Sequence, residues 1–110
     1  MTDTKHTISI ASDHHGVLIK KQISQKLKDE GFQLVDLGPY NEETVDYPDY
    51  AHKLCESILD GSSQYGILIC GTGIGMSIAA NRYSGIRAAI CFNEFMAERA
   101  RAHNDANVLV

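Results

Sequence analysis

The sequence predicts an α/β fold: a Rossmann-like, doubly wound parallel sheet in a single domain of three layers. Short apolar, β-branched runs alternate with segments of helical periodicity along the whole chain. Residues 66–70 and 86–91 are almost continuously apolar, as expected for parallel strands covered by helices on both faces. The 110 residues suffice for one domain, and no repeat or linker divides them, so we assign residues 1–110 to one domain.

The first part of the chain reads as strand, helix, strand. Residues 7–11 (TISIA) are the first expected strand, and residues 32–37 are the second. Between them, apolar residues at helical spacing predict the buried face of a helix: Leu18, Ile19, Ile23 and Leu27. Gly31 stands where a glycine often ends a helix, and Gly38-Pro39 marks a turn after the second strand.

The rest of the chain repeats this alternation. Pro48 suits the first turn of a second helix. Apolar positions predict the buried face of that helix: Ala51, Leu54, Cys55, Ile58 and Leu59. The remaining elements follow in order, with strands over 66–70, 86–91 and 108–110 and helices over 76–81 and 94–103. Asn93 can cap the last of these helices.

Composition excludes several classes of protein. The net charge is −4, from 14 acidic and 10 basic side chains, and no basic cluster interrupts it, so we expect no nucleic acid partner. No apolar run reaches membrane-spanning length, and the start MTDTKHTISIASDHHG lacks the apolar core of a signal peptide. We therefore expect a cytoplasmic protein without a membrane partner. Its three cysteines, an odd number without a C-x-x-C pair, are expected to be free thiols.

Ligands of open α/β sheets bind at the carboxyl ends of the strands. Three polar clusters follow expected strands: Asp13-His14, Cys70 with its glycine loop, and Asn93-Glu94. His103-Asn104 instead ends a helix, so it should lie away from this edge in its own subunit. It could act on the same chemistry only in a second chain.

The segment from Cys70 to Gly75 (CGTGIG) is the most informative one. Its alternating glycines let backbone N–H groups gather at a helix start, where they suit a phosphate or a developing oxyanion. A thiol at such a place favours its thiolate and can act as a base or a nucleophile. We expect Cys55 and Cys91 to be core residues, because each lies on an apolar, buried element.

The histidines carry a weaker signal. His6 and His52 look solvated, and His15 is a neighbour of His14 that need not face the site. His14 with Asp13 is either a satisfied loop pair or part of the site. Adjacent residues rarely converge on one ion, so we expect no metal site here.

Five strings, SDHHG, DYPDYA, GILICGTGIGMSIAAN, GIRAA and HNDANVL, occur in this order from the first strand to the last residue. In them the chain closely resembles the ribose-5-phosphate isomerase B family, which includes the subunits of galactose-6-phosphate isomerase. The resemblance implies a cofactor-free aldose–ketose isomerase of the pentose phosphate pathway. It also implies a homodimer or a dimer of dimers, with sites between subunits, that interconverts ribose 5-phosphate and ribulose 5-phosphate.

The resemblance also implies roles for single residues. Cys70 would move the proton between carbons 1 and 2 through an enediolate, assisted by Thr72, and His103 of the partner subunit would open the sugar ring. The anion hole would comprise Gly71, Gly73, Ile74 and Gly75. The groups that contact substrate would be Asp13 and Asn104 for hydroxyls, His14 for phosphate, and Tyr47 lining the pocket. Family members with a glutamate base carry it where this chain has Met76, so the chain resembles the cysteine type.

Other interpretations stay open. A hexose 6-phosphate, allose or galactose 6-phosphate, is an alternative substrate within the family, and a non-catalytic partner subunit is a further one. A nucleotide-binding module is disfavoured, because the glycine spacing is not G-x-G-x-x-G and the loop follows the third strand. The family continues beyond HNDANVL with a helix and phosphate-binding arginines, so we expect that the C-terminal part of the working protein is missing from these 110 residues.

Overall fold

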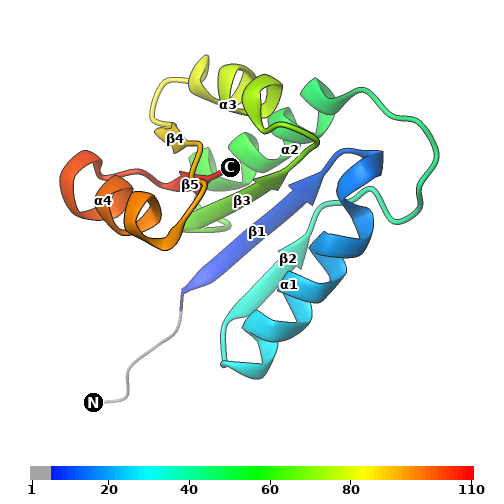
Figure 1. Cartoon of the computed structure of the whole chain (residues 1–110), viewed down its shortest axis with the longest axis horizontal. Helices are drawn as coiled ribbons and strands as arrows, with labels where there is room; N and C mark the ends of the chain where they lie inside the picture. Colours follow the sequence, from blue (N-terminus) through cyan, green and yellow to red (C-terminus); the bar gives the residue numbers. More distant parts are fainter. Residues whose placement is uncertain (1–5) are drawn as a thin grey trace.

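The computed structural model describes residues 6–110 and contains one five-stranded sheet (Figure 1). The strands are β1 Thr7–Ser12, β2 Gln33–Asp36, β3 Tyr65–Ile69, β4 Ala88–Ala89 and β5 Val108–Leu109. All neighbours pair in parallel in the order β2-β1-β3-β5-β4, so the last strand inserts between β3 and β4. The predicted parallel sheet is confirmed.

Helices cover both faces of this sheet, which confirms the predicted doubly wound, three-layer domain (Figure 1). They are α1 Val17–Asp29, α2 Tyr47–Leu59, α3 Ile74–Asn81 and α4 Glu94–Asn104, with a short 3₁₀ helix, η1, at His14–Gly16. Right-handed crossovers place α1 and α4 on one face and α2 and α3 on the other. The Arg101 guanidinium of α4 accordingly lies 5.0 Å from the ring of Tyr65, whereas the next residue, Gly66, faces α2.

The main core lies between the sheet and the α2–α3 layer. Its buried residues are Ala11, Ala51, Leu54, Cys55, Leu68, Met76, Ala80, Ile86 and Val108. A Cβ at Gly66 would lie 2.5 Å from Leu54 Cδ2, so glycine at this position lets α2 approach β3 closely. The predicted face of α2 is therefore largely confirmed, although Leu59 at its end is 50% exposed.

The predicted buried face of α1 is only partly confirmed, because Ile23 and Leu27 are half-buried but the other two predicted residues are not. Leu18 and Ile19 are exposed, and the helix turns Val17, Lys20 and Ser24 toward the sheet instead. Lys20 can face inward because it forms an ion pair with Asp36 of β2, which compensates its buried charge. Periodicity of apolar residues cannot reveal a stripe that contains a buried lysine.

The fourth strand is shorter than predicted. Residues 86–91 were expected to form it, but only Ala88–Ala89 pair with β5 at this edge of the sheet. The Asn81 side chain caps the outer side of Ala88, donating to its carbonyl over 2.9 Å and accepting from its N–H over 2.8 Å. Single backbone hydrogen bonds continue on both sides of β4, because the Arg87 carbonyl accepts from the Asn107 N–H and the Cys91 N–H donates to the Val110 carbonyl.

Candidate active site

The carboxyl ends of β1 and β3 bring two of the predicted clusters together. The backbone N–H of Asp13 donates to the carbonyl of Ile69, the last residue of β3, over 3.0 Å. Cys70 follows directly, so it and Asp13 start from adjacent points of the same sheet edge. The order of strands therefore brings these two clusters together, as their positions after strands predicted.

The glycine loop wraps around the Cys70 thiol. Its Sγ accepts a hydrogen bond from the Gly73 N–H over 3.0 Å, so an amide dipole points at the sulfur. Gly73 has φ +80°, in the left-handed region that favours glycine, and it precedes the first turn of α3. Thr72 Oγ1 accepts from the Ile74 N–H over 3.2 Å, which leaves the hydroxyl proton free to donate elsewhere.

A cavity of about 250 Å³ opens beside this loop, at the ends of β3, β4 and β5. Its lining residues are Leu68, Ile69, Cys70, Gly71, Thr72, Gly73, Ile90, Cys91, Phe92 and Val110. Cys91 and Phe92 were not predicted as site residues, and Cys91 was expected in the core. It is half-buried instead, because it follows the end of β4 and lines this cavity. Its position at the end of an expected strand was the signal that could have found it.

The three thiols have different surroundings. Burial raises the pKa of Cys55 to about 11, and its Sγ lies 3.9 Å from the carbonyl oxygen of Ala80 in the core. Burial also raises the pKa of Cys91. Both thiols therefore keep their protons at neutral pH. Cys70 is distinguished from them by its N–H donor and by its position before a helix.

Asp13 and His14 are held by the backbone around them. Asp13 is 8% exposed, and its Oδ1 accepts from the N–H groups of His15 and Gly16 over 2.9 and 3.0 Å. His14 Nδ1 accepts from the Val45 N–H over 3.2 Å, so the neutral ring carries its proton on Nε2. His15 is exposed, and its ring lies 4.2 Å from the ring of His14.

Tyr47 lies against the last glycine of the loop. It is the first residue of α2, where Pro48 begins the helix as predicted. A Cβ at Gly75 would lie 2.7 to 2.9 Å from the ring and hydroxyl of Tyr47, so only glycine leaves room for this ring at the start of α3. The structure thus brings Tyr47 next to the glycine loop.

His103 and Asn104 lie at the amino ends of the strands, opposite the carboxyl ends where Cys70 lies. Arg87, just before β4, donates from Nε to the Asn104 carbonyl over 2.7 Å, which fixes the end of α4 at the amino ends of the strands. His103 Nε2 lies 3.2 Å from Arg99 Nη1. One subunit therefore does not bring His103 or Asn104 to Cys70, as their place at a helix end predicted.

The third predicted cluster, Asn93-Glu94, follows β4 at the carboxyl edge, where Asn93 stabilises the start of α4. Asn93 Oδ1 accepts from the Met96 N–H over 2.9 Å and caps α4, while Glu94 occupies the first turn.

Within residues 6–110, no group of three or more His, Cys, Asp or Glu side chains is arranged to hold a metal ion. None of the helices described there is long and apolar enough to span a membrane.

Comparison with known proteins identifies the class. The profile of the Ribose/Galactose Isomerase family matches residues 8–110, and the chain belongs to this family. Ribose-5-phosphate isomerase B of Escherichia coli is 43% identical over 102 residues, covering 93% of this chain and 68% of that protein. A relative in Rickettsia conorii is 53% identical over 105 residues, 96% of this chain and 73% of its own, and its name goes no further than sugar phosphate isomerase.

Solved structures agree in sequence and in fold. A ribose 5-phosphate isomerase from Thermotoga maritima is 54% identical, with a TM-score of 0.94 over 96% of this chain and 72% of that one. The type B ribose 5-phosphate isomerase of Trypanosoma brucei is 47% identical, with a TM-score of 0.91, and the match covers 96% of this chain and 72% of that one. The protein is thus an enzyme of the isomerase class.

Proposed function

We propose that this enzyme interconverts ribose 5-phosphate and ribulose 5-phosphate, with Cys70 as the base, at sites shared between two copies of the chain. The observation that carries the proposal is the Gly73 N–H donating to the Cys70 sulfur at the carboxyl edge of β3. The relatives named ribose-5-phosphate isomerase support the choice of substrate.

The chemistry matches what the loop offers. Cys70 removes the proton from carbon 2 of the open-chain aldose, a carbon 1–carbon 2 double bond forms, and the carbonyl oxygen becomes an oxyanion. Return of the proton to carbon 1, with the hydroxyl proton passing between the two oxygens, yields the ketose. Such a reaction needs a matched base and donors aimed at the oxyanion. The donors in this proposal are the amides of Gly71 and Gly75 and the free hydroxyl proton of Thr72. The amides of Gly73 and Ile74 shape the anion hole instead, because they donate to Cys70 Sγ and Thr72 Oγ1.

The remaining roles concern binding and ring opening. Asp13 uses Oδ1 to cap η1, which leaves Oδ2 for a sugar hydroxyl. His14 offers Nε2–H to the phosphate, and Tyr47 lines the pocket beside the glycine loop. His103 opens the furanose ring and Asn104 orients a hydroxyl, both from the partner subunit. Both residues lie at the amino ends of the strands in their own subunit, away from Cys70, and this location supports a homodimer.

A 6-phosphate hexose is the second candidate substrate, because the matching family joins ribose and galactose isomerases. Turnover of ribose 5-phosphate, allose 6-phosphate and galactose 6-phosphate by the same preparation separates the candidates. The highest kcat/KM is expected on ribose 5-phosphate. A higher value on either hexose phosphate would replace the pentose assignment and leave the Cys70 mechanism standing.

Replacement of single thiols tests the base. We expect Cys70→Ala to lower kcat by about 10²–10⁴ or more, since a required base is lost. Cys55→Ala is the matched control, because it removes an equal thiol from the core away from the loop, and we expect activity per folded molecule near that of the wild type. Circular dichroism confirms folding of both variants. Near-normal turnover by Cys70→Ala would refute the assignment.

A further inference from the structure

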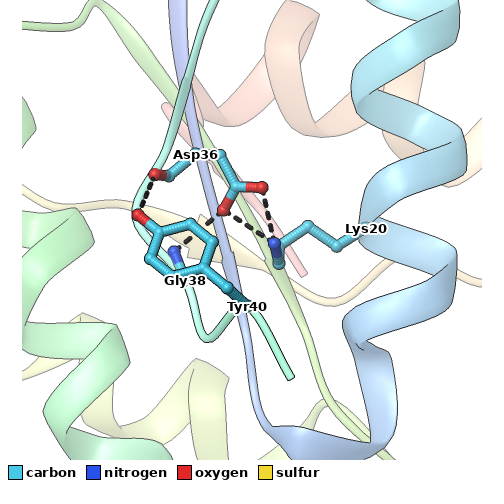
Figure 2. A network of polar contacts seen from close by, with 4 residues as sticks. All are labelled: Lys20, Asp36, Gly38 and Tyr40. Atoms are coloured by element: carbon cyan, nitrogen blue, oxygen red, sulfur yellow. Dashed lines mark hydrogen bonds and ion pairs between the residues drawn. The ribbon is translucent and has the colours of Figure 1, made fainter. Parts of the chain in front are cut away.

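Lys20 is a fully buried cation that the proposed chemistry does not use. It lies near the start of α1, with a side chain that is 0% exposed. Its ammonium group donates to both carboxylate oxygens of Asp36, to Oδ1 over 2.7 Å and to Oδ2 over 2.6 Å (Figure 2). Asp36 is the last residue of β2, so this ion pair joins α1 to the carboxyl edge of the sheet.

Asp36 in turn organises the turn that follows β2. Its Oδ1 accepts from the Gly38 N–H over 2.8 Å, and its main-chain carbonyl accepts from the Tyr40 hydroxyl over 2.8 Å (Figure 2). The ring of Tyr40 also lies 5.4 Å from Lys20 Nζ, within the range of a cation–π contact. Lys20 thus contacts both the carboxylate and the aromatic ring that shape residues 37–40.

This turn is attached directly to the substrate-binding edge. The Gly38 carbonyl accepts from the Ser12 N–H over 3.1 Å, one residue before Asp13. The same loop continues to Val45, whose N–H donates to His14 Nδ1 over 3.2 Å. Residues 37–46 therefore contact Ser12 at the end of β1 and His14 in η1, and Lys20 with Asp36 anchors their first part.

Stability alone does not explain a buried lysine here. Replacing a buried ion pair with apolar residues of similar volume is often neutral or stabilising, because desolvation of both charges is avoided. A buried ion pair does, however, hold its two partners in contact, because separating them would leave a charge unpaired away from water. A contact of this kind suits a loop whose position must be defined.

We propose that Lys20, acting through Asp36, is a positioning residue for the substrate site. It holds residues 37–46 against the end of β1, and so keeps Val45 on His14 and His14 in its Nε2–H tautomer. The consequence for catalysis rests on the proposed function: loss of the pair weakens substrate binding, whereas the proton transfer on β3 and its loop is little affected.

The double variant Lys20→Met/Asp36→Leu tests this, because it removes both charges and leaves neither unpaired. We expect it to fold, with a stability that is lower than that of the wild type because the Gly38 N–H loses its Asp36 acceptor. We expect KM for ribose 5-phosphate to rise at least about tenfold, with kcat within about twofold of wild type, as for lost ground-state contacts to a charged ligand. Lys21→Met, an exposed lysine of the same helix, is the matched control and should leave KM unchanged.

The ring ¹⁵N signals of His14 provide a readout that does not depend on activity. We expect the Nε2–H tautomer in the wild type and a mixture of tautomers in the double variant. Altered His14 signals in a protein that does not turn over ribose 5-phosphate would support the positioning role and contradict the proposed function. Unchanged His14 signals and unchanged KM in the folded double variant would overturn the inference.

If the double variant does not fold, Tyr40→Phe tests whether the turn after β2 positions the substrate site. Tyr40 is 67% exposed, so loss of its hydroxyl should leave the fold intact and remove only the hydrogen bond to Asp36. We expect KM to rise roughly two- to tenfold, the factor for one hydrogen bond, at unchanged kcat. A KM equal to that of the wild type in this variant would count against the role of the turn.

Discussion

Burial and hydrogen bonding give the three thiols of this small domain different chemistry. Cys55 lies in the core, where its raised pKa of about 11 keeps it protonated, and burial raises the pKa of Cys91 as well. Cys70 has the Gly73 N–H pointing at its sulfur and lies at the mouth of a cavity. The proposed base is therefore the thiol whose surroundings can accept negative charge.

Alkylation of the native protein tests this ranking. With iodoacetamide at pH 8, we expect Cys70 to react first and Cys55 last. A thiol with a pKa near 11 is only about 0.1% thiolate at that pH, and it is also inaccessible. Peptide mass spectrometry measures the rate at each site. Loss of activity should follow modification of Cys70, and comparable rates at Cys55 and Cys70 would contradict the ranking.

For single residues, the sequence predicts the site best where the role of a residue depends on its position after a strand. Cys70 and Asp13 could be assigned to the carboxyl edge because both follow apolar strands. Cys91 follows the same rule but was assigned to the core, because the apolar run extends past the true end of β4. Lys20 gave no signal, since its burial depends on Asp36, 16 residues away.

Among the elements, the glycine loop before α3 has a strict backbone requirement at Gly73. Gly73 combines φ +80° with a crowded site, where an added Cβ would lie 3.2 Å from Val110 Cγ1. Gly71 has open space around its Cα and no positive φ. The two glycines look alike in the sequence and differ in what the fold requires of them.

Alanine at these two positions should therefore differ in effect on stability. We expect Gly73→Ala to lower the free energy of unfolding by about 1–2 kcal/mol, the cost of a left-handed conformation for a residue with a Cβ. Gly71→Ala, the matched control, should change it by less than about 0.5 kcal/mol. Urea unfolding followed by circular dichroism measures both. Equal losses in the two variants would show that φ at Gly73 does not constrain the loop.

Prediction of the elements succeeded where local signals exist. Pro48 and Asn93 mark the starts of α2 and α4, and the core face of α2 follows from its periodicity. The face of α1 could be predicted only in part, because it includes Lys20, whose burial depends on its ion pair with Asp36. The length of β4 could not be predicted either, since the apolar run continues to residue 91 while regular pairing stops at Ala89.

For the whole molecule, strand order decides which residues can act together. Cys70 and Asp13 share the carboxyl edge, while α4 runs back across the sheet and leaves His103 at the amino edge. The alternation of strands and helices predicted this separation. It did not reveal that β5 would insert between β3 and β4, because residue patterns contain no information on the order of parallel strands. The separation makes a second copy a requirement of the proposed mechanism.

Hybrid dimers test the central claim, a Cys70–His103 site shared between two copies, most directly. Cys70→Ala and His103→Asn are each prepared as inactive proteins, mixed in equal amounts after dissociation and reassembled, with hybrids counted by native mass spectrometry. Random mixing makes half of the dimers hybrids, each with one intact site of two, so we expect about a quarter of wild-type turnover on ribose 5-phosphate. Hybrids that form in this proportion and show no activity would contradict the account.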